Sequence, residues 1–117
     1  MELNGCDKLI IENLFTNYRG TIMLTEDQYN VVKEMLVERM SKYRRNSFKL
    51  RQLYEIMSNE AREKAYIDFT YQEFREMFIK ECVNGNIPRH KFTIAEEGFL
   101  DRKNRVPYAN IKVETFK

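Results

Sequence analysis

The fold is decided mainly by one stretch, residues 69–85, which read FTYQEFREMFIKECVNG. Thr70 is followed three residues later by Glu73, which is the spacing of a capping box at the start of a helix. Apolar residues then recur with the period of a half-buried helix, and Gly85 ends the pattern. The stretch therefore predicts a capped helix over residues 71–84.

Three further helices and one short strand are predicted upstream. Thr25 and Gln28 have the spacing of a second capping box, followed by apolar residues with a helical period. Ser47 is a candidate cap for another helix with an apolar stripe. The predicted elements are helices over 8–19, 26–42 and 47–59, and a strand over 65–69.

A short helix and a hairpin are predicted downstream. Pro88 suits the first turn of a helix, because its missing N–H would have no partner there. This helix is expected over residues 88–98. Alternating apolar and polar residues on either side of Asn104–Arg105 predict a hairpin with strands over 99–103 and 106–113.

The order helix, strand, helix, helix, hairpin is that of a winged helix-turn-helix. We therefore expect an α+β, mainly helical protein. The winged helix-turn-helix would occupy residues 46–117, and residues 1–45 would form an N-terminal helical extension that serves as a dimer surface.

The composition is that of a small folded protein. The chain has 117 residues, of which 43% are hydrophobic and 13% aromatic, enough for one packed core. No apolar run approaches the roughly 20 residues of a membrane helix, and the N-terminus lacks the basic and apolar pattern of a signal peptide. We expect a cytoplasmic protein that does not enter a membrane.

Residues that commonly carry catalysis or bind metals are sparse. Cys6 and Cys82 are the two cysteines and His90 is the single histidine, whereas a structural zinc site needs about four clustered ligands. The 18 acidic residues are scattered and single out no catalytic pair. No glycine-rich phosphate loop is present. We expect no metal, no cofactor and no enzymatic activity.

Charge is distributed unevenly along a chain whose net charge is +2. Residues 1–38 carry −4 and 61–86 carry −1, whereas 39–60 carry +4 and 87–117 carry +3. Two basic segments in a nearly neutral chain are typical of a nucleic-acid footprint. The run 39–51 has six basic and no acidic residues. For this run, contact with phosphate or a partner and a solvated helix face remain equally open.

Nine residues are candidates for contact with DNA. Residues at the start of a recognition helix reach base edges, where Arg and Lys pair well with guanine. A basic wing tip reaches phosphate or an adjacent minor groove. The candidates are Arg89, His90, Lys91 and Thr93 for the groove, Arg102, Lys103 and Arg105 for the wing, and Gln72 and Arg75 for phosphate. For His90, the role of an exposed polar residue is favoured over base reading.

These motifs resemble the C-terminal winged-helix domain of phage, plasmid and poxvirus-type primase–helicases. The similar features are Tyr71–Phe78, Ile87–Pro88, Arg89–Phe92, Gly98–Phe99, Arg102–Arg105 and Tyr108. The resemblance covers residues 70–113 and implies a DNA-binding module, as in small accessory proteins of plasmids and phages. The chain has no GxxxxGK[ST] loop, so helicase activity is not implied.

The sequence therefore predicts a double-stranded DNA-binding accessory protein or regulator of a plasmid or phage. Because one small module buries too little DNA for strong selectivity, we expect a homodimer. The alternative is a small phage- or plasmid-encoded protein that binds and inhibits another protein, for example a host defence nuclease. Duplex affinity that falls steeply with salt separates the first function from the second.

Overall fold

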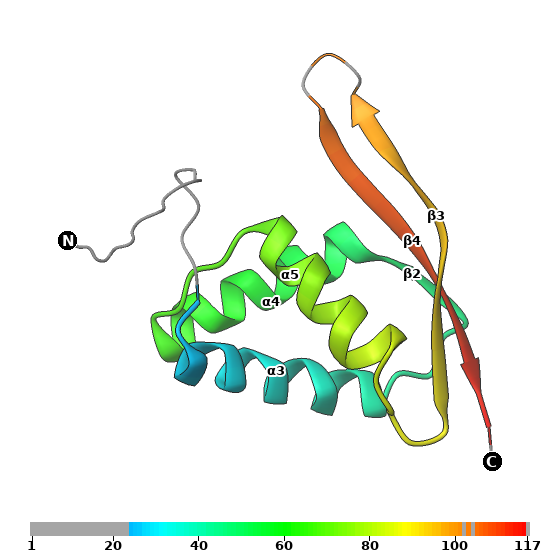
Figure 1. The fold of residues 1–117 in the computed structure, drawn as a ribbon, viewed down its shortest axis with the longest axis horizontal. Coiled ribbons are helices and arrows are strands. Elements are labelled where there is room, and N and C mark those ends of the chain that lie inside the picture. The colour runs from blue at the N-terminus through cyan, green and yellow to red at the C-terminus, as the bar shows by residue number, and fades with distance from the viewer. Residues whose placement is uncertain (1–23, 102, 104, 117) are drawn as a thin grey trace.

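The computed structural model describes residues 24–101, 103 and 105–116 of the chain (Figure 1). In this part, three α-helices and a three-stranded antiparallel sheet form an α+β fold. The elements are α3 (Glu26–Ser41), β2 (Ser47–Lys49), α4 (Leu50–Ala65), α5 (Tyr71–Phe78), the π-helical turn η1 (Ile79–Val83), β3 (His90–Asp101) and β4 (Val106–Thr115). The predicted helix over 8–19 lies outside the described residues.

Two helices begin at capping boxes. At the start of α3, the Gln28 N–H donates to Thr25 Oγ1 and the Thr25 N–H donates to Gln28 Oε1, both at 3.1 Å. At the start of α5, the Glu73 N–H donates to Thr70 Oγ1 at 3.1 Å and the Thr70 N–H donates to Glu73 Oε1 at 2.8 Å. Each pair satisfies two N–H groups that have no partner within the helix. The predicted starts of both helices are confirmed.

The second capped helix ends in a widened turn. α5 passes directly into η1, where the Asn84 N–H donates to the Ile79 carbonyl oxygen at 2.8 Å. Gly85 follows because a Cβ atom at this position would overlap the carbonyl oxygen of Glu81. The predicted helix over 71–84 is confirmed in its extent, and its last turn is wider than an α-helix.

The segment Ser47–Lys49 forms strand β2 instead of the first turn of a helix. It pairs antiparallel with β4. This pairing turns Phe48 toward the core, where its ring centroid lies 5.8 Å from that of Phe78. α4 therefore begins at Leu50, and the predicted helix start at residue 47 is wrong.

The connection from α4 to α5 is not a strand. Tyr66 ends α4 in the left-handed conformation, with φ 56° and ψ 38°. Ile67 and Phe69 are buried, but no strand of the described chain pairs with them. Their alternation reflects two side chains inserted separately into the core, so the predicted strand over 65–69 is wrong.

Strand β3 is the main difference from the sequence prediction. β3 pairs antiparallel with β4, and Phe92 lies opposite Val113. Phe92 is buried and Thr93 is exposed, which is the alternation of a half-buried strand. Thr93 and Ile94 are β-branched and pack well on a pleated surface. The predicted recognition helix over 88–98 is wrong, because the pairing with β4 extends this segment.

The strand order of the sheet is β2-β4-β3, and the last two strands of the chain form a long hairpin. The chain reverses between Asp101 and Val106, which are paired, and the Arg105 N–H donates to the Asp101 carbonyl oxygen at 2.7 Å. The predicted reversal near residues 104–105 is confirmed. The hairpin extends beyond the helices (Figure 1).

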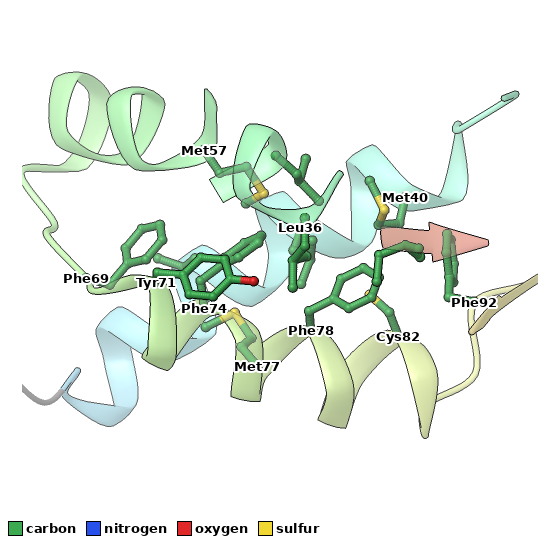
Figure 2. Packing of buried hydrophobic residues seen from close by; sticks show 14 of the residues in the cluster. Leu36, Met40, Met57, Phe69, Tyr71, Phe74, Met77, Phe78, Cys82 and Phe92 are labelled. Atoms are coloured by element: carbon green, nitrogen blue, oxygen red, sulfur yellow. The ribbon is translucent and has the colours of Figure 1, made fainter. Parts of the chain in front are cut away.

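One core joins the three helices to the sheet (Figure 2). The Phe78 ring centroid lies 5.8 Å from that of Phe48 on β2 and 5.8 Å from that of Phe92 on β3. The central buried residues are Leu36 and Met40 of α3, Met57 of α4, Phe74 and Phe78 of α5, Phe92 of β3 and Ile111 of β4. Phe78 therefore connects α5 to two strands at once.

We expect Phe78→Ala to lower the free energy of unfolding by about 3–5 kcal/mol, because it leaves a cavity between α5, β2 and β3. The measurement is chemical denaturation followed by circular dichroism. The control is Val31→Ala on α3, whose side chain is 42% exposed, with an expected change within about 0.5 kcal/mol. Equal losses in the two variants would contradict the central place of Phe78.

Candidate nucleic-acid interface

Two arginines hold the β3–β4 hairpin against the helices. Arg75 of α5 donates from two guanidinium nitrogens to the carboxylate of Glu97 on β3, at 2.9 and 3.0 Å. Arg51 of α4 donates through Nε to the Pro107 carbonyl oxygen on β4 at 2.8 Å. Beyond these contacts lie only the last residues of the two strands, Gly98–Asp101 and Val106, and the turn between them. The two arginines therefore fix the hairpin to the helices close to its tip.

The face of the sheet that points away from the helices carries lysines from all three strands. Because side chains alternate along a strand, residues adjacent to the inward-pointing Phe48, Phe92 and Ile111 point outward. We call three of these outward, exposed residues the basal lysines: Lys49 on β2, Lys91 on β3 and Lys112 on β4.

The strand register brings two of the basal lysines close together. Lys112 lies opposite Ser47 of β2 and opposite Thr93 of β3. Glu114 lies opposite Lys91, and its carboxylate is 3.6 Å from the amino group of Lys112. Glu114 therefore pairs with Lys112, and Lys91 stands across the strands from the same residue.

The pairing of β2 with β4 also joins the two basic segments of the sequence, 39–60 and 87–117. The exposed pair Arg44–Arg45 precedes β2. The adjoining Asn46 accepts a hydrogen bond at its carbonyl oxygen from the Val113 N–H, at 2.9 Å. Part of the basic run whose role the sequence leaves open therefore lies beside the C-terminal end of β4.

The four residues predicted to read base edges lie at the base of the hairpin instead of on a helix. Lys91 and Thr93 point outward on β3, on the same face as Lys112. Arg89 is exposed in the turn before β3, in the left-handed conformation with φ 65°. Three of the four predicted residues therefore present exposed side chains at this end of the hairpin.

His90, the fourth, is held by main-chain groups on both sides. Its Nδ1 lies 2.8 Å from the Pro88 carbonyl oxygen, and its Nε2 lies 2.8 Å from the Tyr43 carbonyl oxygen. The imidazole also stacks on Phe92, with ring centroids 5.8 Å apart. These contacts tie the start of β3 to the chain that follows α3.

The predicted wing residues lie at the far end of the hairpin. The Lys103 N–H donates to Asp101 Oδ1 at 2.9 Å. Arg105 has a φ of 53°, and its guanidinium carbon lies 5.9 Å from the ring centroid of Phe99. Arg102 lies outside the described residues. The tip thus combines cationic side chains with an aromatic ring.

The predicted groove and wing residues form two separate groups. A strand rises by about 3.3 Å per residue, so the ten steps from Lys91 to Asp101 correspond to roughly 33 Å along β3. One cationic group therefore lies at the base of the hairpin and the other at its tip.

Gln72 and Arg75 lie on α5, and both are paired with carboxylates. Gln72 Nε2 donates to Glu76 at 2.9 Å, one turn further along the helix. Arg75 is engaged by Glu97 on the hairpin. Glu97 therefore already pairs with the charge of Arg75 through Nε and Nη2.

Lys49 and Lys112 were not singled out by the sequence as DNA contacts. Lys112 stands between Ile111 and Val113, so the alternation of the predicted strand places it on the outward face. Lys49 belongs to the basic run, but its position depends on β2, which was predicted as helix.

Two titratable groups of the core are protonated at neutral pH. Burial raises the pKa of the Cys82 thiol to about 12. Burial, followed by the hydrogen bond to Glu81, raises the pKa of Tyr29 well above its usual range, and the Tyr29 hydroxyl donates to this carboxylate at 2.7 Å. Among the described residues, no three His, Cys, Asp or Glu side chains are grouped so that they could hold a metal ion. Within the same ranges, no helix has the length and apolar character needed to cross a membrane.

We expect the Cys82 thiol to resist labelling by a disulfide reagent in the native protein, because the thiolate is the reactive form. In a Cys6→Ser background at mildly alkaline pH, labelling by a disulfide reagent should be slower than in denaturant by about a hundredfold or more. Rapid stoichiometric labelling of the folded protein would show that Cys82 is accessible and would contradict its burial.

Comparison with known proteins gives no relative from which a function could be transferred. No protein-family model matches the chain, and no curated protein and no solved structure matches it at a significant level.

Proposed function

We propose that the chain is a double-stranded DNA-binding protein with a winged-helix arrangement, in which the β3–β4 hairpin is the wing. The order α3, β2, α4, α5, β3, β4 and the sheet order β2-β4-β3 support this arrangement. In it, the hairpin lies beside α5, and the proposed duplex contacts come from the hairpin and from the outward face of the sheet, which is turned away from α5. The proposal includes an accessory or regulatory role in a plasmid or phage, because residues 70–113 resemble the C-terminal winged-helix domain of phage, plasmid and poxvirus-type primase–helicases.

One observation carries the proposal: the two basic segments of the chain meet on one outward face of the sheet. The basal lysines come from three different strands, and Arg44–Arg45 adjoin them. A solvated sheet face usually pairs opposite charges across its strands. Here the face carries the three basal lysines against Glu114 and Glu96, and within the described residues only Lys112 of the three forms an ion pair. An excess of cations on a rigid surface is suited to phosphate oxygens, whose counterions are released on binding.

The length of the hairpin supports a duplex as the ligand. The separation of roughly 33 Å between the base and the tip is close to one helical turn of B-DNA, about 34–36 Å. Two cationic groups at this spacing contact the same side of the duplex at points one helical turn apart. The proposed contacts are the basal lysines, with Arg89, at one end and Lys103 and Arg105 at the other.

Backbone strain at two arginines supports a role for their side chains. Arg89 and Arg105 have φ values of 65° and 53°, in the left-handed region that favours glycine. Both residues are exposed, so their side chains are not required to fill the core. Strain of this kind is common at functional positions, and Arg89 and Arg105 lie at the two ends of the hairpin that carry the proposed contacts.

The first test is the salt dependence of duplex affinity. Replacing Lys91 and Lys112 by Gln should weaken binding to random and specific duplexes alike. It should also reduce the slope of log affinity against log salt by about two units, roughly 0.9 for each lost phosphate contact. The matched control is Lys33→Gln with Lys64→Gln, which removes the same charge from α3 and α4.

In the control pair the slope should stay within error of the wild type. Equal loss of slope in both pairs would mean that net charge alone governs binding. A wild-type protein with no duplex affinity at low salt would contradict the proposed function and favour a protein-binding role.

A second test uses the strained positions. Arg89→Gly and Arg105→Gly should each leave the free energy of unfolding unchanged or raise it by up to about 1 kcal/mol, because glycine adopts this conformation without strain. Each should nevertheless lower duplex affinity severalfold. Tyr66→Gly is the control: it relieves the same strain, with φ 56°, in the connection between α4 and α5. If all three substitutions leave affinity unchanged, the two arginines do not contact DNA.

A further inference from the structure

The tip of the hairpin exposes two large apolar side chains. Phe99 is 51% exposed and Leu100 is 65% exposed, and they are consecutive at the end of β3. Phe99 pairs with Pro107, whose carbonyl oxygen accepts from Arg51, and Leu100 is the next residue toward the tip. The core does not require them, and two adjacent apolar residues on a projecting element are typical of a contact surface.

Cationic groups surround this apolar pair. The Arg105 guanidinium lies 5.9 Å from the Phe99 ring centroid, within the range of a cation–π contact. Lys103 is exposed in the same turn. Asp101 takes part in the turn itself, because its side chain accepts from the Lys103 N–H and its carbonyl oxygen accepts from the Arg105 N–H. The tip thus presents apolar groups next to positive charge.

The stem below the tip is braced on its outer face. The Tyr108 ring lies over Gly98, where a Cβ atom would approach it to 3.0 Å. The Tyr108 hydroxyl donates to Glu96 at 3.1 Å, and Asn110 Nδ2 donates to the same carboxylate at 3.0 Å. A braced stem allows the tip to press on a ligand without folding back on itself.

We propose that Leu100, with Phe99 beside it, inserts as an apolar wedge between base pairs from the minor groove and bends the duplex. Apolar side chains flanked by Arg and Lys unstack base steps in this way and kink DNA toward the major groove. Glu96, Tyr108 and Asn110 occupy the outward face between the basal lysines and the tip, so the tip offers a second, separate cationic contact on the same hairpin. This inference rests on the proposed function, and it adds a mechanical action to binding.

The test compares bending with affinity. A duplex of about 25 base pairs, roughly two and a half times the length of the hairpin, carries a fluorescence donor and acceptor at its two ends and is saturated with protein. A second duplex carries 2-aminopurine, whose fluorescence rises when its neighbours unstack. We expect the wild type to increase both signals. Leu100→Ser and Phe99→Ser should each lose most of both increases while affinity falls by less than about tenfold.

The matched control is Ile56→Ser on α4, whose side chain is 52% exposed. It should behave as the wild type does, and thermal melts should show that all variants are folded, since the changed side chains are exposed. Undiminished bending in Leu100→Ser would overturn the wedge, as would wild-type binding without bending.

Two further outcomes separate the wedge from other roles of the tip. Absence of wild-type affinity for any duplex would overturn the proposed function itself, whereas binding without unstacking overturns only the wedge. Binding to vesicles of anionic phospholipid that Leu100→Ser abolishes, together with unchanged duplex bending, would assign the tip to a membrane surface and overturn the inference.

Discussion

Contact among three phenylalanines, Phe48, Phe78 and Phe92, determines how the sheet lies on the helices. Their ring centroids are 5.8, 5.8 and 6.5 Å apart, and the residues belong to β2, α5 and β3. Aromatic rings at such distances add to the free energy already gained by burying them. Once these rings face inward, alternation along each strand turns the adjacent lysines outward. The charge pattern of the surface is therefore a consequence of the packing beneath it.

The parts of the fold that the sequence predicts are those set by nearby residues. The capping boxes at Thr25 and Thr70 depend on partners three residues away, and both form. The segment 88–98 was expected to be a helix because Pro88 suits a first turn, but its conformation is set by pairing with β4, which no local pattern reveals. β2 was missed for the same reason: it has only three residues, and its partners on β4 lie more than 60 positions away.

The sequence predicted several residues of the candidate site but not their arrangement in space. The sequence identified both basic segments, and Lys91, Thr93, Lys103 and Arg105 are exposed on the hairpin. It placed them on a helix and an adjacent wing, whereas they lie near the two ends of one hairpin. The basal lysines are recognisable only from the register of three strands. A surface that is linear instead of compact suits an extended anionic ligand better than a small one.

The most direct test of this account is duplex affinity as a function of duplex length at fixed low salt. Suppose that the base and the tip of the hairpin bind one duplex at points one helical turn apart. The affinity, divided by the number of positions at which the protein can bind along the duplex, should then rise at least tenfold between about 8 and about 14 base pairs and level off. The rise should vanish when Lys91 and Lys112 are both replaced by Gln. Equal corrected affinities for short and long duplexes would contradict the account, because one cationic group would then suffice.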